Sequence, residues 1–207
     1  MRLSVGSGEV EGDLVVPGGA RGIVVFAHGS GSSRHSSRNT HVAEILRADA
    51  LGTLLFDLLT QAEEREDERT RGLRFDIDLL ARRLEAVTDA LEGEPSARGL
   101  PLGYFGASTG AAAALRAASA RPQVRAVVSR GGRPDLAGDA LRAVTAPTLL
   151  IVGELDREVL ELNRTAQKLL GGPSELAIVA GATHLFEEPG ALDDVATLAA
   201  RHFTRYL

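Results

Sequence analysis

The sequence Gly106-Ala107-Ser108-Thr109-Gly110 carries the strongest local signal in the chain. It fits the pattern Gly-x-Ser-x-Gly and lies between an apolar run at 102–107, which predicts a strand, and an alanine-rich run at 109–120, which predicts a helix. A serine in such a sharp turn projects its hydroxyl from the carboxyl edge of a sheet, and small neighbours let other backbone approach closely. The next backbone N–H, that of Thr109, lies at a helix N-terminus, where the helix dipole favours negative charge. We therefore predict that Ser108 is a nucleophile and Thr109 an oxyanion donor.

Short apolar runs alternate with longer amphipathic stretches on both sides of this motif, which predicts strands alternating with helices. The predicted strands cover residues 3–5, 10–16, 22–28, 52–57, 102–107, 124–129, 148–152 and 176–179. The predicted helices cover residues 41–50, 75–91, 109–120, 159–170 and 191–206. The mixed charge run 61–71 is interpreted as a solvated loop or the start of a helix.

This alternation predicts an α/β fold with a mostly parallel eight-stranded sheet and helices on both faces, in one domain covering residues 1–207. The first two strands, separated by Gly6, Ser7 and Gly8, are expected to form an antiparallel hairpin at one edge. Residues 130–146 leave room only for a turn and a short helix. We therefore expect no substantial cap over the sheet.

The composition excludes several classes of protein. The chain has 207 residues, a formal net charge of −5 and no cysteine. A disulfide scaffold, a zinc ribbon and a cysteine nucleophile are therefore excluded, and the mild acidity argues against a nucleic-acid-binding surface. No apolar run approaches the ~18 residues of a membrane-spanning helix, and residues 1–8 lack the apolar region of a secretory signal. We expect a cytoplasmic protein with neither a nucleic-acid nor a membrane partner.

A serine nucleophile needs a histidine base that is oriented by a carboxylate. In this architecture the chain order should be serine, acid, histidine. Asp156 follows the strand at 148–152, and His184 follows the last strand, so both lie at carboxyl ends of strands. We predict a triad of Ser108, Asp156 and His184. The alternatives are Glu154 or Asp135 as the acid, His202 as the base, and a simple helix-capping role for Asp156.

The second oxyanion donor should come from the loop at 28–35, which reads His-Gly-Ser-Gly-Ser-Ser-Arg-His. Small residues there allow a backbone N–H to point into the pocket. Ser30 is the first candidate and Gly31 the second, while His28 is expected to be structural. The glycines also resemble part of a dinucleotide-binding loop, but Arg34 stands where such a loop needs its third glycine.

The chain resembles α/β-hydrolases of the dienelactone-hydrolase-like group. It is especially similar to the small hydrolase domains found joined to phosphoribosyltransferases. The resemblance rests on the sequence from His28 to Asn39, on Gly-Ala-Ser-Thr-Gly, and on Ser-Arg-Gly-Gly-Arg-Pro-Asp from Ser129 to Asp135. It covers nearly the whole chain and implies the triad above and hydrolysis of esters or related acyl compounds. Dienelactone hydrolases use cysteine where this chain has serine, so the resemblance does not extend to dienelactone as substrate.

These residues predict a serine hydrolase that cleaves small carboxylic esters, lactones or thioesters through an acyl-enzyme, a reaction that needs no metal or organic cofactor. The expected partner is a small-molecule acyl substrate. The candidate substrate-binding residues flank the predicted site: Gly31, Arg34, Arg38, Arg130 and Arg133. The arginines suggest an anionic substrate group, and the alternative is that they are solvated surface residues. Two other functions stay open, namely acyl transfer by the same triad and a catalytically silent binding domain.

Overall fold

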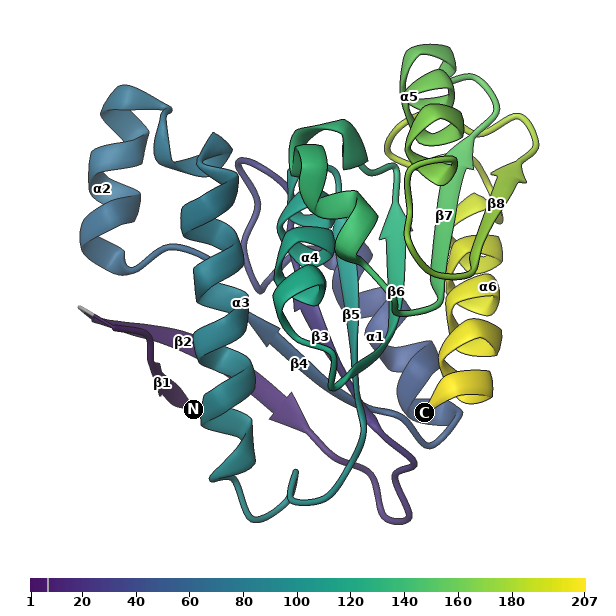
Figure 1. Cartoon of the computed structure of the whole chain (residues 1–207). Coiled ribbons are helices and arrows are strands. Elements are labelled where there is room, and N and C mark those ends of the chain that lie inside the picture. Colours follow the sequence, from purple (N-terminus) through teal and green to yellow (C-terminus); the bar gives the residue numbers. More distant parts are fainter. Residues whose placement is uncertain (7) are drawn as a thin grey trace.

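An eight-stranded sheet forms the centre of the molecule (Figure 1). The structure is a computed structural model and describes residues 1–6 and 8–207. The strands are β1 (Arg2–Ser4), β2 (Glu9–Val15), β3 (Ile23–Ala27), β4 (Gly52–Phe56), β5 (Leu102–Ala107), β6 (Val124–Arg130), β7 (Thr148–Gly153) and β8 (Ser174–Val179). Their order across the sheet is β1-β2-β4-β3-β5-β6-β7-β8. The predicted mostly parallel α/β fold is confirmed.

The antiparallel part of the sheet is confined to one edge. β1 pairs with β2 and β2 pairs with β4 in antiparallel register, whereas the pairs from β4 to β8 are parallel. The predicted hairpin of β1 and β2 is therefore confirmed, and Ser7 of its predicted turn lies outside the described residues. β3, β4 and β7 are buried along their whole length, which is why their sequences are continuous apolar runs.

Helices cover both faces of the sheet (Figure 1). One core cluster joins the sheet to α1 (Ser37–Ala48) and α6 (Ala191–Tyr206), through residues such as Val42 and Val195. A second cluster, which includes Leu84 and Leu115, joins the other face to α3 (Ile77–Glu92) and α4 (Thr109–Ala120). The 3₁₀ segment η2 (Pro134–Ala143) and α5 (Arg157–Gln167) complete this second layer. Only η2 lies between β6 and β7, which agrees with the expected lack of a large insertion there.

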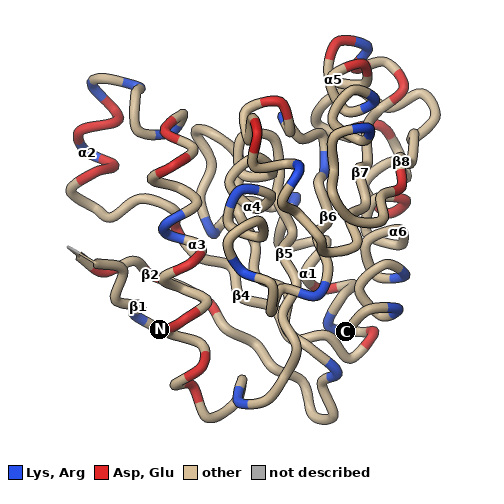
Figure 2. Tube along the Cα trace, in the orientation of Figure 1, with Lys and Arg blue, Asp and Glu red and all other residues tan. Residues whose placement is uncertain are grey.

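The charge run after β4 forms a complete helix, α2 (Gln61–Thr70), to one side of α3 (Figures 1 and 2). Thr60 begins it with a capping box, because its hydroxyl accepts from the N–H of Glu63 while the Glu63 carboxylate accepts from the N–H of Thr60. Figure 2 shows acidic and basic residues interspersed along α2. The two acidic residues of its first turn and the basic residue of its last turn interact favourably with the helix dipole.

The helix predicted to begin at Phe75 begins instead at Ile77. Asp76 is its N-cap and accepts a hydrogen bond from the N–H of Leu79. Phe75 belongs to a short 3₁₀ turn, η1 (Leu73–Phe75), and its side chain is 55% exposed. Phe75 therefore lies outside the helix predicted for it, because the cap fixes the start of the helix two residues later.

The parallel strands bring their carboxyl ends to one edge of the sheet. The loops after β3, β5, β6, β7 and β8 meet there, and they contain the residues predicted to be catalytic. Within residues 1–6 and 8–207, no helix is both long enough and apolar enough to span a membrane.

Candidate active site

Ser108 occupies a strained turn between β5 and α4. Its φ of 52° and ψ of −121° are rare for a residue with a side chain. A Cβ on Gly106 would lie 2.4 Å from the Cα of Ala111, and one on Gly110 would lie 2.3 Å from the carbonyl oxygen of Ala27. Both distances are below van der Waals contact. The two glycines of the motif therefore let β3, β5 and α4 approach closely enough to hold the serine in this turn.

Asp156 and His184 form a close pair at the same edge of the sheet. Nδ1 of His184 lies 2.6 Å from Oδ2 of Asp156. A carboxylate can only accept, so Nδ1 carries the proton and Nε2 keeps the lone pair that a general base requires. Asp156 precedes α5 but makes no side-chain capping hydrogen bond. Its carboxylate is thus used to orient the imidazole rather than to cap the helix.

The alternative acids and the alternative histidine have other partners. Glu154 accepts a hydrogen bond of 2.8 Å from the N–H of Gly181 and so fixes the loop that leads to His184. Asp135 forms a two-point pair with Arg133, at 2.9 and 2.7 Å. His202 lies on α6, where its Nε2 is 3.1 Å from the carbonyl oxygen of Pro147. Asp156 and His184 are the members of the predicted set that the fold brings into contact with each other.

Two hydrogen bonds fix the loop after β3. Nε2 of His28 accepts from the N–H of Leu58 at 3.1 Å, so its Nδ1 carries the proton and donates to the carbonyl of Gly29 at 2.9 Å. Burial lowers the pKa of His28 and keeps the ring neutral. The N–H of Ser30 donates to Oγ1 of Thr109 at 2.9 Å. The two predicted oxyanion residues are therefore in contact, and in this state the amide of Ser30 is engaged by a hydroxyl.

Ser108 and His184 line a common cavity of about 230 Å³ with Ser30, Arg38 and Arg130. The N-terminus of α1 also reaches it, through its capping residue Ser36. The site therefore combines a strained serine, an oriented imidazole, a helix N-terminus and two guanidinium groups. This arrangement can support attack on an acyl carbonyl with the imidazole as base.

The sequence profile of the family described as "Alpha/beta hydrolase domain" matches residues 20–194. The chain belongs to this α/β-hydrolase family. The crystal structure of a dienelactone hydrolase from Anabaena variabilis is 58% identical, with a TM-score of 0.98 over 100% of this chain and 96% of that one. An alpha-beta serine hydrolase homologue from Coxiella burnetii shares the fold, with 20% identity and a TM-score of 0.79 over 97% of this chain and 95% of that one.

Curated relatives from two strains of Mycobacterium tuberculosis are 59% identical over 208 residues and carry the provisional name of phosphoribosyl transferase. The match covers 100% of this chain but only 46% of theirs. The α/β-hydrolase described here thus spans about half the length of these relatives.

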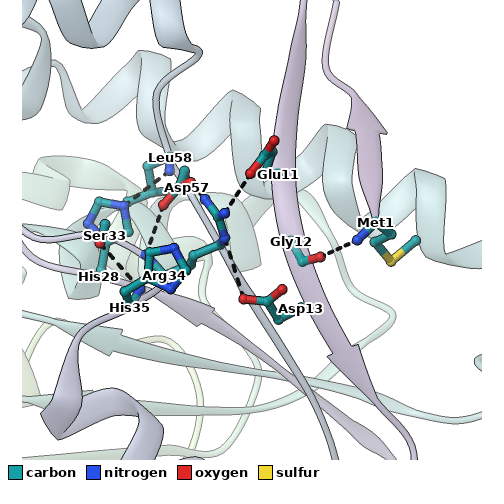
Figure 3. Close-up of polar contacts among 10 residues, drawn as sticks. All are labelled: Met1, Glu11, Gly12, Asp13, His28, Ser33, Arg34, His35, Asp57 and Leu58. Atoms are coloured by element: carbon teal, nitrogen blue, oxygen red, sulfur yellow. Dashed lines mark hydrogen bonds and ion pairs between the residues drawn. The ribbon is translucent and has the colours of Figure 1, made fainter.

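The structure separates the four predicted substrate-binding arginines of this α/β-hydrolase into two pairs. Arg34 forms ion pairs with Glu11, Asp13 and Asp57 (Figure 3). Burial alone would lower the pKa of Arg34, but the hydrogen bond and charge of Asp57 outweigh it and raise the pKa. Its role is to join β2 to the end of β4. Arg34 does not line the Ser108 cavity, so its expected contact with substrate is not supported.

Arg133 also has a carboxylate partner, Asp135, and lies outside the Ser108 cavity. Arg38 and Arg130 do line that cavity. Arg130 is only 7% exposed, and burial, followed by the nearby charge of Arg38, lowers its pKa to about 10. It therefore remains charged at neutral pH, next to a second cation.

Gly31 lines a separate, small cavity of about 30 Å³ on the α2 side of the loop after β3. That cavity also contains Arg74, whose guanidinium would lie 3.4 Å from a Cβ on Gly31. Arg74 is paired with the buried carboxylate of Asp67 from α2. Neither Arg74 nor Asp67 was singled out from the sequence, and Asp67 belongs to the charge run 61–71 that was interpreted as a solvated loop or the start of a helix.

A glycine after β6 lies against His184, the predicted base, and was not singled out as a site residue from the sequence. Gly131 has a φ of 50°, and a Cβ there would lie 3.2 Å from the carbonyl oxygen and 3.5 Å from Cε1 of His184. The sequence signal was the pair Gly131-Gly132 directly after a predicted strand, since adjacent glycines often mark a close approach of backbone.

Proposed function

We propose that this α/β-hydrolase cleaves small carboxylic esters, or related lactones and thioesters, through an acyl-enzyme on Ser108. The observation that carries the proposal is the contact of 2.6 Å between His184 and Asp156, at the sheet edge where Ser108 occupies its strained turn. The 58% identical structure bears the name dienelactone hydrolase, which supports hydrolysis of an acyl bond. Because dienelactone hydrolases in general use a cysteine where this chain has Ser108, we do not propose dienelactone as the substrate.

In the proposed reaction, Nε2 of His184 takes the proton of Ser108 as the serine oxygen bonds to the acyl carbon. Asp156 holds the imidazole in the required tautomer and stabilises the imidazolium. The amides of Thr109 and Ser30 donate to the oxyanion, which is a stronger acceptor than the Thr109 hydroxyl that Ser30 contacts at rest. The imidazolium protonates the leaving group. Water then attacks the acyl-enzyme, with His184 again as base.

A fluorophosphonate probe and a substrate panel test this assignment. We expect the probe to label Ser108, and esters, thioesters and lactones to be hydrolysed by the wild type. Ser108→Ala should lose labelling and turnover. Ser119→Ala is the matched control, because Ser119 lies on α4 with its hydroxyl bonded to the carbonyl of Arg116. Undiminished ester turnover in Ser108→Ala would refute the proposal, and products formed with added alcohols would reveal acyl transfer.

The provisional phosphoribosyl transferase name belongs to chains about twice as long. The present sequence has no acidic pair followed by a small-residue phosphate loop of the phosphoribosyltransferase kind. We therefore assign the hydrolase chemistry to this chain. A phosphoribosyl transfer assay on this chain alone should give no product.

A further inference from the structure

Arg130 is a buried cation whose charge is not balanced by an acidic partner. It is the last residue of β6 and is only 7% exposed, and its Nη1 is buried without a hydrogen-bond partner. No carboxylate of residues 1–6 or 8–207 forms an ion pair with it. An unpaired buried charge costs free energy. Such a group is therefore retained at a cost to stability, which a bound anion would relieve.

Arg38 places a second guanidinium in the same cavity. Its Nε is also buried without a partner, and its one ion pair is a long contact of 3.4 Å with Glu187, whose side chain is 65% exposed. Two cations that repel each other thus line one cavity with Ser108. Arg34 and Arg133, the other two arginines predicted for this site, each have a close carboxylate. Among these four arginines, the two that lack a close carboxylate are therefore the two that line the cavity with Ser108.

The backbone adds further positive potential at this point. α1 is 12 residues long, its first turn contains no acidic residue, and its capping residue Ser36 lines the cavity together with Ser32. A helix N-terminus and nearby hydroxyls suit an oxyanion, because both supply hydrogen-bond donors and the helix dipole favours negative charge. Two guanidinium groups together with this dipole match a doubly charged group better than a singly charged one.

We propose that Arg38, Arg130 and the N-terminus of α1 form a subsite for an oxyanion group of the substrate, and that a phosphate monoester binds there more tightly than a carboxylate. This proposal rests on Ser108 being the nucleophile of the same cavity. The physiological substrate is then an acyl ester that carries a phosphate group. The anion is held on the α1 face of the sheet while its ester carbonyl reaches Ser108 and the amide of Thr109.

Anion binding can be measured without any turnover. We expect inorganic phosphate, titrated calorimetrically at constant ionic strength, to bind the wild type and Ser108→Ala alike, and acetate to bind more weakly. Arg130→Gln and Arg38→Gln should each weaken phosphate binding about tenfold, because each removes a charge-assisted hydrogen-bond donor. Arg164→Gln is the matched control, since Arg164 lies on α5 and pairs with Glu161. Phosphate binding that is absent from the wild type, or unchanged in Arg130→Gln, overturns the subsite.

The melting temperature gives an independent measure of the unpaired charge of Arg130 and of anion binding to it. Without phosphate, Arg130→Gln should melt at a higher temperature than the wild type, because it removes an unpaired buried charge. Phosphate should raise the melting temperature of the wild type and leave that of Arg130→Gln nearly unchanged. A lower melting temperature for Arg130→Gln in both conditions would assign Arg130 a purely structural role.

A comparison of two ester substrates distinguishes this proposal from the hydrolase assignment. Phenyl acetate with a phosphate group on the ring should have a higher kcat/KM than the neutral analogue that has a methyl group in place of the phosphate. Arg130→Gln should abolish this difference in kcat/KM while it still hydrolyses the neutral ester. Equal efficiency for the two esters in the wild type overturns the substrate class alone. If no ester is hydrolysed but phosphate still binds, the hydrolase assignment fails and the anion subsite stands. Acetate binding as tight as that of phosphate overturns the preference for double charge.

Discussion

The carboxylates of Asp156 and Glu154 lie two residues apart in sequence and have different partners. Asp156 contacts His184 at 2.6 Å, whereas Glu154 accepts from the backbone of Gly181. Sequence order alone left both as candidate acids, because both follow the end of β7 directly. Their hydrogen bonds favour Asp156 as the proposed acid, since the carboxylate of a triad must contact a ring nitrogen of the histidine.

Asp156→Asn should therefore lower kcat by a factor on the order of 10³–10⁴, because an amide does not hold the imidazole in the tautomer that leaves Nε2 free. Glu154→Gln should keep most of the activity, since a neutral amide oxygen still accepts the hydrogen bond from Gly181. Steady-state kinetics on one ester measure both variants. A larger loss in Glu154→Gln than in Asp156→Asn would reverse the assignment of the acid.

The glycines next to Ser108 are predicted to be required for stability, because a side chain at these positions would clash with neighbouring backbone. A Cβ on Gly110 would lie 2.3 Å from one backbone carbonyl oxygen and 2.4 Å from the next, those of Ala27 and His28. Backbone at the centre of a sheet cannot move aside cheaply, so Gly110→Ala should lower the free energy of unfolding by about 3 kcal/mol or more. Gly18→Ala is the control, because a Cβ there meets nothing within 4 Å. Urea unfolding of both variants provides the comparison, and equal stability would mean that the turn relaxes freely.

From the sequence, the position of the candidate catalytic residues in the fold is easier to predict than that of the candidate substrate-binding arginines, for a physical reason. Serine, acid and histidine each follow a strand, so the strand pattern alone places them at one edge of the sheet. For the arginines, contact with substrate depends on which way a long side chain turns and on whether a carboxylate lies within reach. Arg34 meets three carboxylates from β2 and the end of β4, a pairing across the sheet that no local pattern reveals.

Among the helices, α2 shows where local patterns give an incomplete answer. Its sequence has no apolar periodicity, because its one buried residue is the carboxylate of Asp67, which is paired with Arg74. The signal that could have predicted its start was the spacing of Thr60 and Glu63, a capping box. The helix is thus specified by its cap, its terminal charges and one buried ion pair rather than by an apolar face.

Between strands, Arg34 joins β2 to the end of β4. Its guanidinium contacts Glu11 and Asp13 of β2 and Asp57 after β4 (Figure 3). Arg34→Gln would leave three carboxylates close together, so it should lower the free energy of unfolding by about 1–2 kcal/mol, a modest figure because two of the carboxylates are partly exposed. The effect should shrink in high salt, which screens the repulsion.

Urea unfolding at low and high salt measures this effect, and kcat/KM for a neutral ester should stay near the wild-type value, because Arg34 lies outside the Ser108 cavity. A large loss of kcat/KM in a stably folded Arg34→Gln would instead return this residue to the active site.

At the scale of the whole molecule, the alternation of apolar runs predicts the fold. Buried titratable groups determine how the stability of that fold responds to pH. His28 and His202 are both largely buried, one at the start of the loop after β3 and the other on α6 against Pro147. Burial is the largest cause that lowers the pKa of each below the ordinary value of 6.5. The folded protein therefore keeps both rings neutral at a pH where the unfolded chain already binds protons.

The sign of the pH effect follows from that difference. Below about pH 6.5 the unfolded chain takes up protons at these histidines before the folded protein does, so the free energy of unfolding falls as the pH falls, by at most ~1.4 kcal/mol per pH unit for each histidine. The stability that these two neutral rings contribute is fully present above that pH and is lost as the pH falls below it. His28→Gln can keep the hydrogen bond from Leu58 through its amide oxygen, and it should reduce the slope of stability against pH between about pH 7.5 and 5.5. Chemical unfolding at several pH values, with His202→Gln alongside, measures the contribution of each histidine to the slope. A slope in His28→Gln equal to that of the wild type would show that the pKa of His28 is the same in the folded and the unfolded protein, against the expectation from its burial.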